Sequence, residues 1–233
     1  MTAFDVEALI AQLETLGEQT LQEVAHHPVM AAWFAGRPDR ERVFAFQAQL
    51  YYQVAATIPL LERCARTCER LAANDPMYAV LARHYAHHAL EESEPVPHEI
   101  LLLDGLRQQG FCVDPLPPPG RAVQEYIDRG FWAAEHAPIH ELGRAAVLER
   151  VGGRLAQRVP RAAASAPAGT ADFYGVHATA DSSRGGHVDE NARILRELSV
   201  FATFVARAHE VLAGGEHARE YMRGLLAYVD AQP

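Results

Sequence analysis

Apolar residues recur at helical spacing along almost the whole chain. The first such segment, residues 5–25, places apolar side chains on one face, at Val6, Leu9, Ile10, Leu13, Leu16 and Leu21. Similar patterns cover about 40–73, 76–94, 98–109, 121–136, 138–163, 171–182, 188–213 and 216–230. No segment shows the strict alternation of a half-buried strand followed by a hairpin turn. The pattern therefore predicts an all-α fold of roughly seven to nine helices.

Residues that start, bend or stop helices divide these segments. Asp39 can cap a long helix over 40–73, which Pro59 is expected to kink. Gly110 ends the segment 98–109, and residues 114–120 contain four prolines that favour a stiff surface loop. A Gly–Gly pair at 214–215 separates the last two predicted helices. No linker or repeat interrupts the chain, so we expect one domain over residues 1–233.

Charge and composition narrow the class of function. The 233 residues carry a formal net charge of −9, which disfavours a nucleic-acid partner because phosphate binding requires a basic surface. All 21 basic residues are arginine, so Schiff-base chemistry on lysine is excluded. The chain lacks an apolar run of about 18 residues and a basic, apolar N-terminal leader. We therefore expect a cytoplasmic protein that does not bind membranes.

The most informative chemical feature is the pair His177 and Asp181. Four residues apart on a helix, an imidazole and a carboxylate lie on one face and can hold a metal ion from one side. His187 follows after a loose stretch with two glycines, where a helix break can return it to the metal. Arg184 occupies the helically aligned position instead and can bind a substrate carboxylate. Nitrogen and oxygen ligands without sulfur suit iron, manganese or zinc.

Other acids and histidines are candidates for the same centre. Glu62 is flanked by apolar residues, and a carboxylate there is either a ligand or an ion-pair partner of Arg63 or Arg66. Tyr51 lies three turns earlier on the same face and can line the same cavity. A polar cluster runs over residues 84–98, with His98 as its best candidate ligand.

Glu149 is the remaining candidate ligand. It follows a run of small and apolar residues and precedes Gly152 and Gly153, which is typical of a close approach to the backbone. The alternative is an exposed glutamate paired with Arg150 or Arg154. The two Glu-x-x-His pairs of ferritin-like centres are absent, so the ligands need another arrangement.

Taken in order, these residues resemble the heme-oxygenase-like diiron oxidases. That family has a seven-helix fold, which TenA-type thiaminases, the PQQ-synthesis oxidase and heme oxygenases share. His27–Pro28 and the segment 47–52 are similar to a TenA-like opening. The resemblance implies a metal-ligand set of Glu62, Glu91, His98, Glu149, His177, Asp181 and His187, with Glu92 and Glu94 as alternatives to Glu91. The chain departs from the family's closing motif, because Arg184 stands where its last histidine is expected and His187 comes three residues later.

The resemblance also implies an activity. It predicts two Fe(II) ions per chain that react with O2, a small-molecule substrate and an external reductant, with a homodimer as the candidate assembly. The expected reaction is C–H desaturation of a small aliphatic amino acid with intramolecular C–N cyclisation, or N-oxygenation. Arg184 or Arg193 would hold the substrate carboxylate, and Tyr51 would line the substrate site.

Four other functions are compatible with the same fold. A fatty-acid oxidative decarboxylase would need a long apolar tunnel, whereas an amino acid needs a small pocket with an arginine. A heme-degrading oxygenase would use His26 or His27 as the axial ligand. A TenA-like hydrolase would need Cys64, Cys68 or Cys112 in the cavity. A helical binding protein without enzymatic activity would leave the histidines scattered on the surface.

Overall fold

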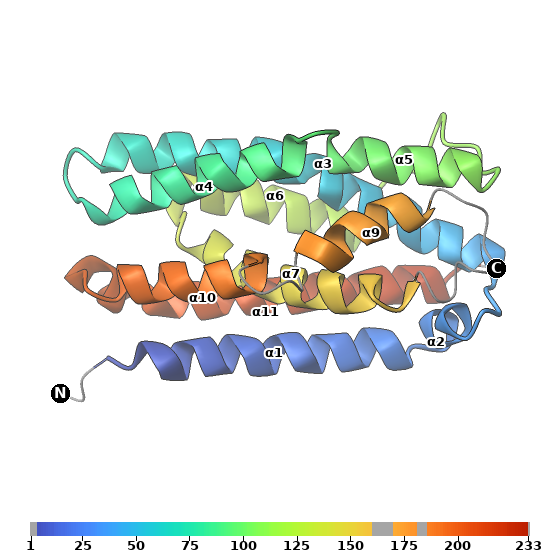
Figure 1. The fold of residues 1–233 in the computed structure, drawn as a ribbon, viewed down its shortest axis with the longest axis horizontal. Coiled ribbons are helices and arrows are strands. Elements are labelled where there is room, and N and C mark those ends of the chain that lie inside the picture. The colour runs from blue at the N-terminus through green and yellow to red at the C-terminus, as the bar shows by residue number, and fades with distance from the viewer. Residues whose placement is uncertain (1–3, 160–169, 181–185, 233) are drawn as a thin grey trace.

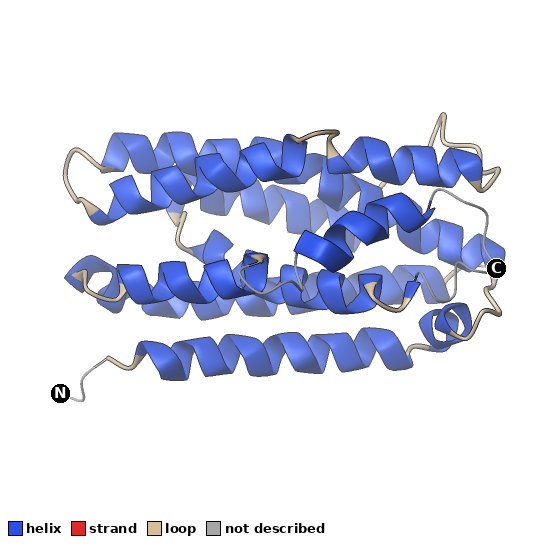
Figure 2. Cartoon of the chain, viewed as in Figure 1, coloured by secondary structure: helices blue, strands red, loops and turns tan. Residues whose placement is uncertain are grey.

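The computed structural model describes residues 4–159, 170–180 and 186–232, and every regular element in these ranges is a helix (Figures 1 and 2). The first half contains α1 (Val6–His26), α2 (Pro28–Phe34), α3 (Arg40–Leu71), α4 (Met77–Ser93) and α5 (His98–Gln108). The second half contains α6 (Arg121–His136), α7 (His140–Ala156), α9 (Thr170–Ala180), α10 (His187–Leu198) and α11 (Ala202–Asp230). The all-α prediction is confirmed over this part of the chain.

Side-chain caps and glycine account for several helix ends. Asp39 accepts a hydrogen bond from the backbone N–H of Arg42 and caps α3, as the sequence predicts. Asp5 accepts bonds from Glu7 and Ala8 at the start of α1. Gly110 adopts φ of 79° just beyond α5, a left-handed conformation that glycine reaches without strain. Pro59 does not end α3, because the helix continues through it to Leu71.

The Gly214–Gly215 pair does not separate two helices, which corrects the predicted boundary. Both glycines lie inside α11, and the chain breaks earlier, between Leu198 and Ala202. A Cβ on Gly214 would lie 1.9 Å from the carbonyl oxygen of His140, and one on Gly143 would lie 1.7 Å from that of Val211. Gly143 on α7 and Gly214 on α11 therefore let the backbones of the two helices touch. This close packing outweighs the low helix propensity of glycine.

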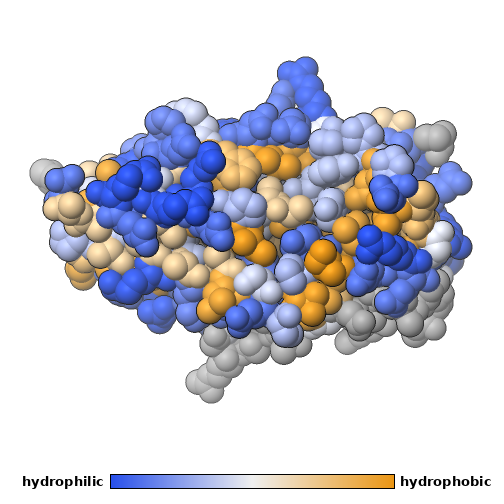
Figure 3. Space-filling view, turned by 90° about the horizontal axis from the view of Figure 1, so that it is seen from above, coloured by the Kyte–Doolittle hydropathy of each residue, from blue (hydrophilic) through white to orange (hydrophobic). Residues whose placement is uncertain are grey.

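Two groups of roughly parallel helices enclose the middle of the molecule. In Figure 1, α3, α4, α5 and α6 form the upper group, while α1, α7, α10 and α11 form the lower one. Helix α9 crosses obliquely between the groups and packs against α5 and α7. The face seen in Figure 3 carries apolar residues in separate patches among hydrophilic ones. No helix among the described residues has the length and apolarity needed to span a membrane.

Candidate metal centre

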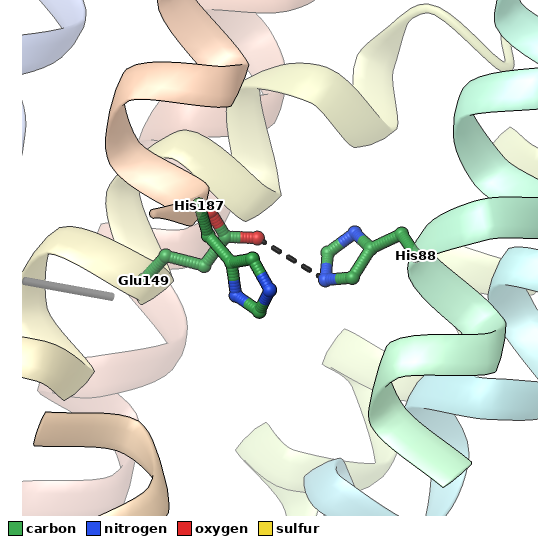
Figure 4. Close-up of side chains that lie close together, drawn as sticks. All are labelled: His88, Glu149 and His187. Atoms are coloured by element: carbon green, nitrogen blue, oxygen red, sulfur yellow. Dashed lines mark ion pairs between the residues drawn. The ribbon is translucent and has the colours of Figure 1, made fainter. Parts of the chain in front are cut away.

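Three side chains from separate helices converge between the two groups of helices. His88 extends from α4, Glu149 from α7 and His187 from the first turn of α10, and all three point toward one another (Figure 4). His88 Nε2 lies 3.3 Å from Glu149 Oε1, and the rings of His88 and His187 are 5.1 Å apart between centroids. One donor atom from each residue lies within 4.8 Å of the other two. This first group can therefore hold one metal ion.

A second set of side chains lies beside the first. His98 Nδ1 is 2.7 Å from Glu92 Oε2, so the start of α5 is tied to the end of α4. The ring of His177 on α9 lies edge-on to that of His98, with 4.7 Å between centroids. Glu92, His98 and His177 thus supply one carboxylate and two imidazoles from three elements. We call them the second group.

Glu92 connects the two groups through its two carboxylate oxygens. Oε2 faces His98, while Oε1 lies 3.5 Å from His88 Nε2 in the first group. A carboxylate with one oxygen toward each ligand group has the arrangement of a bridging ligand in a dinuclear centre. Burial alone would raise the pKa of Glu92, but hydrogen bonds from His88 and His98 outweigh it and hold this pKa well below its usual value.

The same contacts set the charge of His88. Burial disfavours its imidazolium, yet the hydrogen bond to Glu92 and the negative charge of Glu149 raise the pKa of His88 to about 9. At neutral pH a proton on His88 therefore partly neutralises the two buried carboxylates. Metal ligation requires that proton to leave.

Further polar residues support the first group from outside. Asn191 donates a hydrogen bond to Glu149, and His187 Nε2 lies 3.5 Å from Glu91 Oε2. His84 is buried one turn before His88 and contacts Glu190 on α10 at 3.8 Å. Outer contacts of this kind orient metal ligands and fix the imidazole tautomers.

The local sequence explains why α4 turns its polar residues inward. His84, His88 and Glu92 follow one another at intervals of four and are all buried. They share a face with apolar Leu81, Tyr85 and Ala89, so this face is buried along the length of the helix. The sequence-based ligand set named Glu91 with Glu92 only as an alternative, and it omitted His88. The period of four among buried apolar neighbours is the signal that could have identified His88 and Glu92.

The structure brings four of the seven predicted ligands into the two groups, namely His98, Glu149, His177 and His187. Glu149 is 11% exposed at its side chain and contacts His88, so the alternative of an exposed glutamate does not hold. His187 reaches the site as the first residue of α10, directly after Gly186, whose backbone is extended rather than helical. Asp181 and Arg184 lie outside the described residues.

Glu62, by contrast, is not brought to the site. Its side chain is 53% exposed and pairs with Arg66 one turn later, which is the ion-pair alternative. Glu91 lies at the edge of the candidate metal centre, where it contacts exposed His87 on one side and buried His187 on the other. Its neighbour Glu92 is buried inside the centre. A step of one residue on a helix turns the side chain by about 100°, which separates these two roles.

The predicted substrate residues also lie elsewhere. Arg193 is exposed and pairs with Glu190 and Glu197 on its own helix. Tyr51 is half-buried and packs against Tyr52, and it is not among the residues that line the cavity described next.

A cavity of about 130 Å³ adjoins the ligands. His88, Glu92, Glu149 and His177 line it, together with mostly apolar residues of α2, α3, α6, α7, α9 and α11. His26, His27, Cys64, Cys68 and Cys112 are not part of its lining. Cys112 is exposed, and burial raises the pKa of the Cys68 thiol to about 12. These positions do not favour a heme ligand at His26 or His27, or a nucleophilic cysteine.

Solved structures with similar backbones share this fold. A domain of unknown function with a heme oxygenase-like fold from Shewanella denitrificans OS217 is 20% identical, with a TM-score of 0.70 over 98% of this chain and 93% of that chain. A TenA homologue from Pseudomonas syringae pv. tomato DC3000 is 10% identical, with a TM-score of 0.76 over 100% and 98%. A CADD-like protein of unknown function from Nostoc punctiforme is 17% identical, with a TM-score of 0.61 over 94% and 98%.

Comparisons at the sequence level add no closer relative. No protein-family profile matches the chain, and no curated protein matches it. Identities of 20% and below establish shared architecture alone. On that ground the chain has the heme-oxygenase-like, TenA-like helical fold, as its sequence predicts.

Proposed function

We propose that this chain is an O2-dependent non-heme oxidase with a dinuclear iron centre, acting on a small aliphatic amino acid. The observation that carries the proposal is Glu92, whose two oxygens face His88 on one side and His98 on the other. The donors are imidazole nitrogens and carboxylate oxygens without sulfur, a set that suits iron or manganese. These donor groups therefore suit a pair of metal ions. A carboxylate shared by both ions is the kind of ligand that keeps such a pair close together.

Four histidines and two glutamates would hold the metals. His88, Glu149 and His187 would bind one ion, and His98 and His177 the other, with Glu92 between them. When bound, an Fe(II) pair supplies electrons for the reduction of O2. For a desaturation, the substrate and an external reductant each give two electrons, and O2 with the four accompanying protons becomes two molecules of water.

The protein's own residues would control access and orientation. The apolar walls of the cavity exclude water from the reacting C–H bond. Asn191, Glu91 and Glu190 would keep the histidines and Glu149 in a fixed orientation through the contacts described above.

Oxidation of a fatty acid is a second candidate, which the length of the cavity favours. On α7 the lining runs from Glu141 to Leu155, roughly 20 Å along the helix axis. An extended aliphatic chain would fill such a space.

Anaerobic loading with Fe(II) followed by exposure to O2 tests the oxidase proposal. We expect about two irons per chain and O2 uptake by the loaded protein. His88→Ala and His177→Ala should each lose iron and O2 uptake. His209→Ala is the matched control, because His209 is exposed on α11. Absence of iron binding, or a Soret band formed on titration with heme, would contradict the proposal.

A further inference from the structure

A buried ion pair lies in the wall of the same cavity. Arg144 Nη1 donates to Glu141 Oε2 at 2.9 Å, and the two side chains are 4% and 9% exposed. Both residues belong to α7 and line the cavity together with His88 and Glu149. Neither is needed to hold the metals in the proposed ligand set.

The surroundings of Arg144 are built for a guanidinium group. Its Cζ lies 4.0 Å from the ring centroid of Tyr126, a cation–π contact. A Cβ on Gly130 would lie 2.2 Å from Arg144 Nη1, so α6 leaves room for the side chain at that position. Among the described residues, no group accepts a hydrogen bond from Arg144 Nε. A donor of this charged side chain is therefore buried beside the cavity and still available.

The charges of Arg144 and Glu141 cancel each other, and the two nearest histidines add none. His140 and His217 lie near Arg144, but burial and the arginine's charge lower their pKa values to about 4 and about 2, so both are neutral. Arg144 and Glu141 then form one pair of opposite charges in the cavity wall, separate from the charged contacts among His88, Glu92 and Glu149. A buried ion pair stabilises a fold weakly compared with apolar residues of the same volume. Because stability gives little reason for such a pair, its position in a cavity wall is better explained by recognition of a charged ligand.

We infer that Arg144 and Glu141 bind the carboxylate and the ammonium group of an α-amino acid, and that its aliphatic side chain lies against the apolar lining near the metal ligands. This inference rests on the proposed function and names the residues that select its substrate. A zwitterion adds no net charge to the cavity. Its carboxylate would face Arg144 and its ammonium group would face Glu141, so each charge meets an opposite one. A fatty-acid carboxylate would leave one uncompensated negative charge next to Glu141.

Equilibrium binding to the full chain tests this assignment. The probes are L-leucine, its analogue without the amine (4-methylpentanoate), its analogue without the carboxylate (isopentylamine), and dodecanoate. Trp33 lines the cavity and can report binding by fluorescence in a Trp132→Phe background, because Trp132 is the exposed one of the two tryptophans. We expect L-leucine to bind about 100-fold more tightly than either truncated analogue, since each leaves a buried charge unpaired.

Variants of the pair give a second readout. Arg144→Gln should weaken L-leucine binding about 100-fold, and the double variant Glu141→Gln/Arg144→Gln should do the same without leaving a lone buried charge. Arg150→Gln is the matched control, because Arg150 lies on the same helix but pairs with Glu14 and Glu18. Tighter binding of dodecanoate than of L-leucine, or unchanged L-leucine binding in the double variant, would overturn the assignment.

The two proposals fail separately. Binding is measured on the metal-free chain and again on the chain loaded with Fe(II) without O2. Iron loading with O2 uptake but no amino-acid binding in either form would reject the roles of Arg144 and Glu141 alone. Selective L-leucine binding to a chain that takes up no iron would reject the oxidase and leave the binding pair intact.

Discussion

His88 Nε2 on α4 and Glu149 Oε1 on α7 lie 3.3 Å apart, joining the upper and lower groups of helices across the buried middle of the molecule (Figure 4). The pKa of His88 is raised to about 9, because Glu92 and Glu149 outweigh the effect of burial. In the metal-free protein this proton occupies the place that a metal ion would take. In the proposed metal centre, this pair would therefore link metal binding to pH.

The first prediction concerns this linkage. Below pH 9 the metal-free chain carries a proton on His88, and a metal ion that binds its Nε2 must displace it. The affinity for Zn(II), used as a redox-inert probe, should rise as pH increases from 7 to about 9 and then level off. Calorimetric titrations in buffers with different ionisation enthalpies would measure the released proton. A constant affinity over this range, without proton release, would contradict the role of His88.

The second prediction separates the two candidate glutamates. Glu92→Gln should lower metal affinity at least about tenfold, because it removes the charge between the two ligand groups. Glu62→Gln should leave metal content unchanged and alter stability by less than about 1 kcal/mol, since only a surface ion pair with Arg66 is lost. Metal content of the two purified variants, measured side by side, checks both statements. Equal loss in both variants would contradict this ligand assignment.

The contrast between Glu62 and Glu92 shows where sequence reasoning reaches its limit. Local chemistry predicts the helical segments, the N-terminal cap at Asp39 and the helix end at Gly110. The structure confirms all three. The direction in which an acid points depends on which face of its helix is buried, and that depends on the neighbouring helices. Glu62 has apolar neighbours in sequence but lies on an exposed face.

Glycines raise the same difficulty for helix boundaries. Gly214 and Gly215 have low helix propensity, and a break at that point is the local expectation. Gly214 admits the backbone of α7 at His140, some 70 positions away in the chain, and Gly215 makes room for the side chains of Leu13, Leu16 and Val147. Spacing along one helix cannot reveal such a contact.

The third prediction tests that close packing. Gly143→Ala should lower the free energy of unfolding by about 3 kcal/mol or more, because its Cβ would overlap the carbonyl oxygen of Val211 and the backbone cannot easily retreat. Gly175→Ala is the control, since a Cβ there meets nothing within 4 Å. It should be neutral or stabilise by up to about 1 kcal/mol. Denaturant titrations of both variants would decide, and equal stabilities would contradict the packing argument.

The fourth prediction concerns acid stability. Hydrogen bonds from Arg223 and Arg219 lower the pKa of Glu23 to about 2 and connect α1 to α11. A carboxyl group whose pKa is lowered by folding stabilises the fold at pH values above its pKa in the unfolded chain. This contribution is lost as pH falls from about 4.5 to about 2. Wild-type stability should fall with pH in this range more steeply than that of Glu23→Gln. Parallel slopes for the two proteins in thermal unfolding would contradict the assignment.

Anomalous diffraction at the iron edge, from crystals loaded with Fe(II) without O2, tests the central claim most directly. We predict two iron peaks roughly 3.5–4 Å apart, one beside His88, Glu149 and His187 and the other beside His98 and His177, with Glu92 between them. The partly exposed cluster of His87, Glu91 and Glu190 can also hold a cation by its geometry, and it serves as an internal comparison. Iron found only there, or no ordered iron at the two buried groups, would contradict the dinuclear centre.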